Sequence, residues 1–473
     1  MHRAGNDGFD HRDVELIRPL RGRLSALVAS AVLVSGLVVG LPATAEVKPG
    51  GFMSANVTWL GHIPLDAPGV GGRVVTVATP AGPQVRFFVT GAKGLTIYDV
   101  TNPTLPIPLG TVALPHFQNE DVSVSDDGDR VIISGERVSG GATVPGFGPT
   151  FVIDASDPRV PVIAKVLTVG SHTVTCVDAD CDWIYSSSGE IYDLRDLSAP
   201  QSILKGAAGW TAKVEAQGVV FQQGAHDLNV DAAGYVITDT VPRVMLDVAD
   251  PLNPVVLTTS DEAHGANLAY QHNNLRPGAD TWVPRNDGAA YVPGEALFDG
   301  EILLANGETN FEPECGPGSG PFSTWSTKNW DKGQPFTFID VYRPLNGEWV
   351  DGNPAFNVVG CSGHWFTERD GVVATGWYEH GVRFLEVDDR GFISEVGFFQ
   401  PVVTSASGAY WASDDIVYTV DYARGIDILR FDRDALVPDQ AEIDASWQAG
   451  LGAAPTSAAL AERFACQLAQ RAA

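Results

Sequence analysis

The chain has 473 residues, of which 44% are hydrophobic, and its formal net charge is −28. This length and composition fit one large repeat domain or two or three ordinary domains. The negative charge excludes a general affinity for nucleic acid, which needs a basic surface, and it excludes electrostatic attraction to anionic membranes. Solubility is the simplest interpretation of the charge, and cation binding is the alternative.

The first 45 residues have the pattern of an export signal. Four arginines between residues 12 and 23 precede an apolar run over residues 24–41, and Ala43-Thr44-Ala45 places small residues where a signal peptidase cleaves. We predict a signal peptide over residues 1–45 and a secreted, extracellular or envelope-associated protein, with no stable membrane span after cleavage. The apolar run is long enough that an uncleaved membrane anchor is the alternative.

One short phrase recurs seven times along the rest of the chain. It places aliphatic residues around an aspartate, as in Ile97-Tyr98-Asp99-Val100, and a polar turn that often contains proline follows it. The copies begin at Thr96, Phe151, Glu190, Val244, Thr337, Arg383 and Asp427, and the last two are less regular. A phrase that recurs in this way indicates a repeat architecture.

Each copy is flanked by further β-rich segments with polar turns between them. A predicted hairpin stands before the phrase, as in residues 122–133, and another strand follows it, as in residues 393–398. Each unit therefore contains four strands, with the phrase on the third. Such units in series predict a propeller, because one four-stranded sheet buries both faces only when neighbouring sheets stack on it. We predict an all-β, seven-bladed β-propeller of four-stranded antiparallel blades over residues 46–435.

The seventh unit lacks a fourth strand in the sequence after Phe431. Residues 57–64, near the start of the predicted domain, resemble the fourth strands of other units, such as residues 109–112 and 396–399. We therefore predict that this N-terminal strand completes the seventh blade. Closure of the ring in this way removes exposed sheet edges.

Two segments interrupt the repeat, and a tail follows it. Residues 206–224 form a short insertion between the third and fourth units, and residues 262–335 form a longer insertion in the fifth. Long excursions from a rigid scaffold often carry function, and a loop that merely covers one face is an equal alternative. In the tail, residues 436–473, apolar residues at four-residue steps predict a short amphipathic C-terminal helix.

The five cysteines fit export into an oxidising space. Cys176 and Cys181 flank a tight turn, and we predict a disulfide there, because an isolated Cys-x4-Cys is a weak zinc signal. We expect Cys315 and Cys361 to form the second pair, which leaves Cys466 in the tail.

The phrase also carries a family resemblance. Ile97-Tyr98-Asp99-Val100 with Asn102-Pro103, and Leu246-Asp247-Val248 with Asp250-Pro251, resemble the LVIVD repeat of secreted bacterial propellers. The resemblance covers residues 57–433. It implies a propeller fold and export, and it implies no particular activity.

Histidines recur at one position of the repeat. His172, His226 and His364 each stand just before the hydrophobic core of a predicted first strand. In the fifth unit His264 and His272 are both candidates, and we favour His272. The first strand of a propeller blade is the innermost, so we expect these side chains to ring the central channel at one depth.

A ring of imidazoles has three interpretations. Neutral imidazole binds zinc, copper, iron or nickel, so the four histidines would hold one transition-metal ion. They would otherwise line a polar, water-filled channel entrance, or a pocket for a small anionic ligand. Four acids are candidate ligand-binding residues or outer partners of an ion. They are Glu120, in the same register as the histidines, and Asp239, Glu308 and Glu379, near the ends of predicted second strands.

Propellers with channel histidines that hold a metal occur among the selenium-binding proteins, including methanethiol oxidase, which this chain resembles at the level of the fold alone. The sequence lacks the Gly-x-Ser-x-Gly, Gly-x4-Gly-Lys-Ser/Thr and His-Glu-x-x-His motifs. We therefore expect a binding scaffold rather than an enzyme, with an extracellular protein or a small molecule as its partner. A metal-dependent oxidoreductase or hydrolase that uses the four histidines is the alternative. A propeller that binds partners only at its rim is the third possibility.

Overall fold

The computed structural model describes residues 51–65, 69–91, 94–114, 118–139, 142–167, 170–198, 202–261, 270–308, 315, 319–344, 361–401 and 404–435, without the side chains of 51, 52, 118–120, 136–139 and 142–147. The chain divides into two units, residues 1–45 and 46–473, and every described residue belongs to the second. The predicted signal peptide, His264 and the tail with its helix and Cys466 lie outside the described residues.

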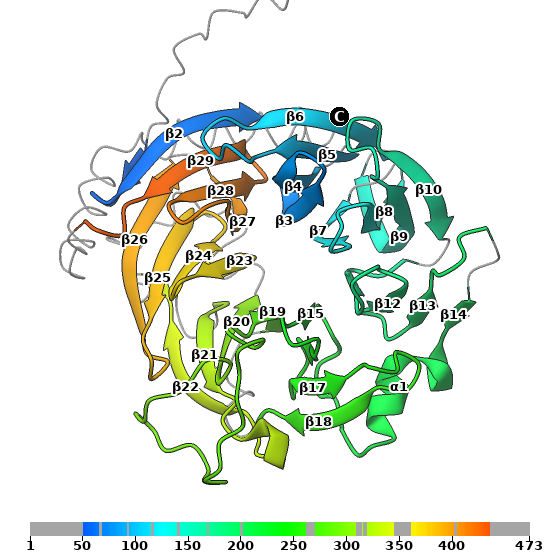
Figure 1. Ribbon diagram of the computed structural model, residues 1–473, viewed down its shortest axis with the longest axis vertical. Coiled ribbons are helices and arrows are strands. Elements are labelled where there is room, and N and C mark those ends of the chain that lie inside the picture. Colours follow the sequence, from blue (N-terminus) through cyan, green and yellow to red (C-terminus); the bar gives the residue numbers. More distant parts are fainter. Residues whose placement is uncertain are drawn as a thin grey trace, which may run out of the picture. The chain divides into compact units, whose positions relative to one another are not determined.

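Seven antiparallel sheets follow one another around a common centre and form a seven-bladed propeller (Figure 1). From inner to outer strand, blade one consists of β3 (Gly69–Thr79), β4 (Gly82–Gly91), β5 (Gly94–Asp99) and β6 (Ile107–Ala113). Blade two consists of β7 (Gln118–Val124), β8 (Arg130–Ser139), β9 (Ala142–Asp154) and β10 (Val162–Leu167). Blade three consists of β11 (Val174–Cys176), β12 (Trp183–Ser186), β13 (Ile191–Asp193) and β14 (Ser202–Leu204). Blades four and five are β15 (Leu228–Val230), β16 (Val236–Thr238), β17 (Val244–Asp247) and β18 (Val255–Thr259); and β19 (Tyr270–Leu275), β20 (Ile302–Glu308), β21 (Phe322–Ser326) and β22 (Thr337–Tyr342). Blade six consists of β23 (Phe366–Arg369), β24 (Val372–Gly376), β25 (Val382–Val387) and β26 (Ile393–Pro401), and β1 (Gly51–Met53) pairs with the outer edge of β26. Blade seven consists of β27 (Ala406–Trp411), β28 (Ile416–Asp421), β29 (Gly425–Phe431) and β2 (Val57–Pro64). The predicted fold class is therefore confirmed.

The strands bury both faces because each blade packs between two others. In β17 three successive residues, Val244, Met245 and Leu246, are fully buried, whereas a strand with one face in solvent would alternate. Val244 and Leu246 pack with Tyr185 of blade three, and Met245 packs with Leu303 of blade five. The aliphatic residues of the repeated phrase thus stabilise two blade interfaces at once.

The fifth copy of the phrase lies on a strand other than the one we predicted. Six copies fall on third strands, but residues 337–341 fall in β22, the outermost strand of blade five. The third strand of this blade is β21, which the sequence pattern did not reveal because it lies inside the predicted insertion. That insertion, residues 262–335, therefore contains three of the blade's own strands, β19, β20 and β21.

The aspartates of the phrase hold turns, as the sequence predicts. Asp99, Asp154 and Asp247 each accept a hydrogen bond from the backbone amide two residues ahead, at 2.9, 3.0 and 2.9 Å. Asp340, in the displaced fifth copy, accepts instead from the amide of Ile393 in blade six, at 3.0 Å. Because this copy lies on an outer strand, its carboxylate joins two blades.

Part of the remaining excursion in blade five is packed against the blades. Between β19 and β20, the buried Arg276 forms an ion pair with Asp231 at 2.6 Å. The rings of Trp282 and Trp330 lie 4.7 Å apart, centroid to centroid. These contacts fix the excursion to the outside of blades four and five.

The shorter predicted insertion, residues 206–224, carries the one α-helix of the described residues. It is α1 (Trp210–Glu215), which follows a 3-10 turn at Gly206–Ala208. Trp210 is fully buried, and its indole stacks on Tyr185 with the ring centroids 6.0 Å apart. Among the described helices none is long and apolar enough to cross a membrane.

The N-terminal strand closes the ring, as predicted. β2 pairs with β29 along its whole length, and β1 adds a fifth strand to blade six that the sequence did not indicate. Asp427 of β29 accepts from the Trp59 indole at 2.9 Å and lies 3.1 Å from Nδ1 of His62, both on β2. Burial raises the pKa of Asp427, but hydrogen bonds from Arg424, His62 and Trp59 and the charge of Arg424 outweigh burial and lower this pKa to about 2.

Replacing Asp427 by asparagine is expected to loosen this closure. We expect the free energy of unfolding at neutral pH to fall by about 2–3 kcal/mol. A carboxylate with a lowered pKa stabilises the fold only while it is ionised, so the wild type should lose the same contribution as the pH falls from about 4 toward about 2. Thermal unfolding followed by circular dichroism across this pH range measures both effects.

Asp415→Asn is the matched control. Asp415 pairs with Arg430 at the surface, where the two side chains are 51% and 47% exposed, so its loss should cost less than about 1 kcal/mol. An Asp427→Asn variant with the melting temperature and the acid profile of the wild type would contradict the role of this carboxylate.

Candidate metal centre

Four histidines from four successive blades lie in ring contact, and we call them the histidine cluster: His172, His226, His272 and His364. Successive ring centroids are 4.3 Å apart between His172 and His226, 4.2 Å between His226 and His272, and 4.3 Å between His272 and His364. His226, His272 and His364 are buried, and His172 is half-buried. The structure thus brings together the four positions that share one register of the repeat.

The inner strands account for this convergence. β15, β19 and β23 follow one another around the centre of the propeller in Figure 1. His172, His226 and His364 each stand two residues before an inner strand, whereas His272 lies within β19. The pairing of β19 with β20 shifts register between Gln271 and Asn273, and a bulge of this kind re-aims the side chain at its centre, here His272.

Neighbouring blades also hold the backbone of the histidine cluster. The Thr173 hydroxyl of blade three donates to the carbonyl of His226 in blade four at 2.5 Å. The Asn306 side-chain amide of blade five donates to the carbonyl of His364 in blade six. Because each of these bonds crosses a blade interface, the position of one histidine depends on the position of the adjacent blade.

Ring nitrogens of the histidine cluster have the lone pairs that a metal ion needs. Nδ1 of His364 lies 2.5 Å from the carbonyl oxygen of Ser407. A carbonyl only accepts, so Nδ1 carries the proton and Nε2 keeps its lone pair, which is the usual orientation of a metal-binding imidazole. Nε2 of His172 and Nε2 of His226 face each other at 2.8 Å, so at most one proton lies between them.

Glu308 adds an oxygen to the cluster. It is the last residue of β20, and its Oε2 lies 3.5 Å from Nε2 of His226. Each of His226, His272 and Glu308 offers one ligand atom, and these atoms all lie within 4.8 Å of one another. Glu308 is thus a predicted acid whose side chain reaches the histidines.

Tyr378, which the sequence did not single out, holds Glu308 in place. Its hydroxyl donates to Oε1 of Glu308 at 2.5 Å, and its ring lies 4.8 Å from that of His364. Tyr378 has a φ of 38°, in the left-handed region, which costs a non-glycine residue about 1–2 kcal/mol. Strain of this kind persists only where surrounding contacts impose it, and no sequence signal marks it.

The other predicted acids have different surroundings. Asp239 is fully buried; it lies 3.4 Å from Nη2 of Arg243 and accepts from Asn274 at 2.8 Å. Burial raises the pKa of Asp239 to about 7, against the lowering effects of Arg243 and Asn274. Glu379 follows Tyr378 and is buried, with Ser405 Oγ 3.4 Å from its Oε1. Glu120 lies in β7, and its side chain is outside the described part of the chain.

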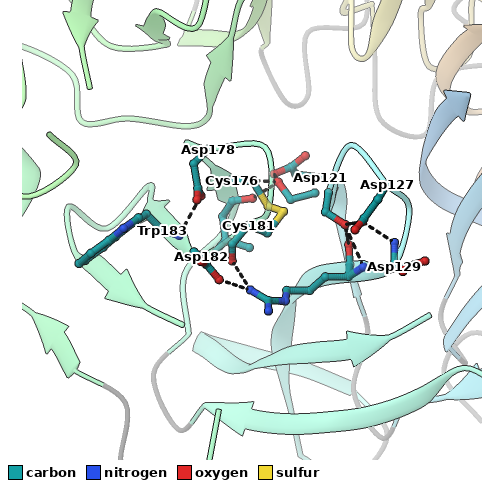
Figure 2. Close-up of a disulfide and its surroundings, with 12 residues drawn as sticks. Asp121, Asp127, Asp129, Cys176, Asp178, Cys181, Asp182 and Trp183 are labelled. Carbon is teal, nitrogen blue, oxygen red and sulfur yellow. Dashed lines mark hydrogen bonds and ion pairs between the residues drawn. A yellow bond between two sulfur atoms is a disulfide. The ribbon is translucent and has the colours of Figure 1, made fainter. Parts of the chain in front are cut away.

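Both predicted disulfides are present. Cys176 and Cys181 form the first, across the hairpin turn of blade three (Figure 2). In the same turn, Asp178 accepts from the amide of Trp183 at 2.9 Å, and Asp182 forms an ion pair with Arg130 of blade two at 2.8 Å. Cys315 and Cys361 form the second disulfide. It joins the connection that follows β20 to the segment before blade six.

The second disulfide has a histidine beside it. Nε2 of the buried His380 lies 3.5 Å from Sγ of Cys315. Metal binding by cysteine requires thiolates, so the disulfide keeps this group of Cys315, Cys361 and His380 from acting as a metal site. Burial lowers the pKa of His380 well below its ordinary value, and the charge of Arg383 lowers it further.

The histidine cluster therefore has the donor set of a transition-metal site. Imidazole nitrogens suit zinc, copper, iron and nickel, and a carboxylate oxygen is a common companion ligand. Tetrahedral nitrogen ligands at about 2.0–2.1 Å from an ion lie about 3.3 Å apart, so His172 and His226 would need to separate by about 0.5 Å. The hydrogen bonds at Nδ1 of His364 and at Oε1 of Glu308 supply the outer contacts that orient such ligands.

Comparisons with known proteins add little to this description. No family model matches the chain, and no curated protein matches it. Among solved structures, the chain is similar to the crystal structure of the Cps50 (Swd1) β-propeller domain of Myceliophteria thermophila, with 12% identity over 79% of this chain and 99% of that chain and a TM-score of 0.46. The fold assignment follows from the seven sheets of the chain itself.

The two disulfides are expected to differ in their contribution to stability. Cys176 and Cys181 are 5 residues apart and Cys315 and Cys361 are 46 apart, so loop-closure entropy predicts losses of about 2 and about 4 kcal/mol when each pair is replaced by alanine. Urea unfolding of the two double variants measures this difference. Equal losses, or a larger loss for the shorter loop, would contradict the entropic account.

Proposed function

We propose that the protein is an exported LVIVD-type β-propeller that acts as a binding scaffold and holds one transition-metal ion in the histidine cluster. The observation that carries this proposal is the contact of four imidazoles from four successive inner strands, with successive centroids 4.2–4.3 Å apart. Repetition of blades alone supplies equivalent positions, but it does not supply the bulge at His272 or the carboxylate of Glu308 beside His226.

The arrangement of the ligands supports a site that also accepts a second molecule. The histidines come from blades three to six, so an ion that they hold has its other coordination positions toward blades seven, one and two. Figure 1 places β27, β3 and β7 on that side of the centre. A small molecule with a donor atom for the ion is the partner that this geometry favours, and an extracellular protein bound at the rim is the other.

A metal-dependent oxidoreductase or hydrolase is the second candidate. Catalytic metal sites keep a coordination position open for substrate, whereas structural sites are closed by protein ligands. Four imidazoles fill a tetrahedral site, so an open position requires an ion that takes five or six ligands. The position of all four imidazoles on one side of the ring leaves the other side for such a ligand. The fold already has two disulfides and the β2–β29 closure to stabilise it, so it has no evident need of a structural ion.

Metal analysis of the purified full chain tests the proposal. After separate loading with zinc, copper, iron and nickel salts and removal of excess, we expect about one ion per chain by elemental analysis for at least one metal. His226→Ala and His364→Ala should each lose it, because each removes a ligand from the cluster. An ion at 100 times its dissociation constant should also stabilise the wild type by about 2.7 kcal/mol, measurable as a rise in melting temperature.

His62→Gln is the control for this experiment. It removes an imidazole from β2, on the outer edge of blade seven, and should leave the bound ion in place. A wild-type chain that binds none of the four metals, or histidine variants that retain the ion, would refute the metal site and leave only the binding scaffold.

A further inference from the structure

A single tight turn lies between the second disulfide and the histidine cluster. It comprises residues 377–381, Trp377-Tyr378-Glu379-His380-Gly381, and joins β24 to β25 in blade six. Every residue in it is buried. The turn touches the disulfide with two of its side chains and the histidine cluster with a third.

On the disulfide side, both sulfurs have a partner in the turn. The indole Nε1 of Trp377 donates to Sγ of Cys361 at 3.2 Å. An imidazole nitrogen of His380 lies 3.5 Å from Sγ of Cys315. The two sulfur atoms therefore contact residues on both sides of Tyr378 in the sequence, Trp377 and His380.

On the other side, Tyr378 contacts the candidate metal centre twice. Its ring packs against His364, and its hydroxyl fixes Oε1 of Glu308, which turns Oε2 toward His226. The neighbouring Tyr422 stacks loosely on Tyr378, with ring centroids 6.3 Å apart. Tyr378 thus links the turn to the histidine cluster.

The backbone of the turn is restrained from two sides. Tyr378 exchanges two hydrogen bonds with Ala406 of blade seven, at 3.0 and 2.8 Å, and holds a φ of 38°. Gly381 has a φ of 70°, and a Cβ there would lie 2.2 Å from the carbonyl oxygen of Phe399. A segment held in a strained conformation from both sides responds to a change on one side by moving as a unit.

We propose that the Cys315–Cys361 disulfide positions the histidine cluster through this turn, with Tyr378 as a positioning residue for Glu308. The proposal rests on the metal-binding function proposed above. Without the sulfur–sulfur bond, the two buried side chains are no longer held at bonding distance. The two sulfurs then separate to non-bonded contact, which displaces Trp377 and His380. Tyr378 moves with them and releases Glu308, so the ion is held less tightly.

Ion affinity of matched variants tests this coupling. With cobalt(II) as the probe and a competing chelator, we expect Cys315→Ala/Cys361→Ala to bind 10–100-fold more weakly than the wild type, as is typical when outer-shell contacts are lost. Cys176→Ala/Cys181→Ala removes the other disulfide and should bind within about threefold of the wild type, because that bond lies in the hairpin turn of blade three. Equal affinities for the two double variants would overturn the proposal.

Tyr378→Phe keeps the test informative even if the first double variant does not fold. It preserves the ring against His364 and removes only the hydroxyl on Glu308, so it should weaken cobalt binding to a similar degree and shift the visible absorption bands of the bound ion. A merely structural tyrosine would leave those bands unchanged, and unchanged bands would overturn the positioning role. If the wild type binds no cobalt, zinc or other tested ion, the metal-binding proposal itself fails. If the wild type binds and the variants match it, only the coupling fails.

Discussion

The stacking of blades is the constraint on which the rest of the structure depends. A four-stranded sheet with aliphatic residues on both faces is stable only between two other sheets, so no blade can be the last in an open row. The pairing of β2 with β29 closes the row into a ring, because the N-terminal strand β2 becomes part of the seventh blade. Asp427 joins that pair through Trp59 and His62, at a pKa low enough to stay ionised through the ordinary pH range. The histidine cluster follows from the same constraint, because closed stacking fixes where the inner strands meet.

The number of blades and the closure of the ring could be predicted from the sequence, because every blade needs apolar residues for packing against its neighbours. Each interface requires aliphatic residues, and in most blades an aspartate holds the following turn, so the phrase recurs along the chain. The prediction was wrong in blade five, where the phrase lies on β22. The third strand there, Phe322–Ser326, contains three polar residues without alternation, all buried, and the Ser323 and Thr324 hydroxyls donate to the carbonyls of Ala305 and Gly391. Pattern alone cannot identify a strand whose polar residues are satisfied by distant segments. β1 escaped prediction for a similar reason, since three residues carry no period.

In the candidate site, too, some residues could be predicted from the sequence and others could not. The register of the repeat was enough to group His172, His226 and His364, because equivalent positions on stacked blades must be neighbours. His272 required a choice against His264, and the bulge in β19 that places it depends on pairing with β20. Asp239 and Glu308 stand at similar places after second strands, yet one lies beside Arg243 and the other beside His226. That difference depends on which distant side chains lie beside each carboxylate. Tyr378 could not be found at all, since its role depends on a φ of 38° that no residue pattern encodes.

The pairing of β2 with β29 also has a consequence for the order of events during synthesis. Trp59 and Asp427 are 368 positions apart, so β2 leaves the ribosome long before the strand that it pairs with exists. Contacts of such separation are slow to form, because the intervening chain must be brought into order before they gain anything. Throughout synthesis β2 is therefore a strand with an unsatisfied edge, and its half-buried Trp59 and Ile63 have no cover. A chaperone that recognises extended apolar segments would find its longest-lived target at the N-terminal end of this domain, and release from that chaperone would coincide with completion of the seventh blade.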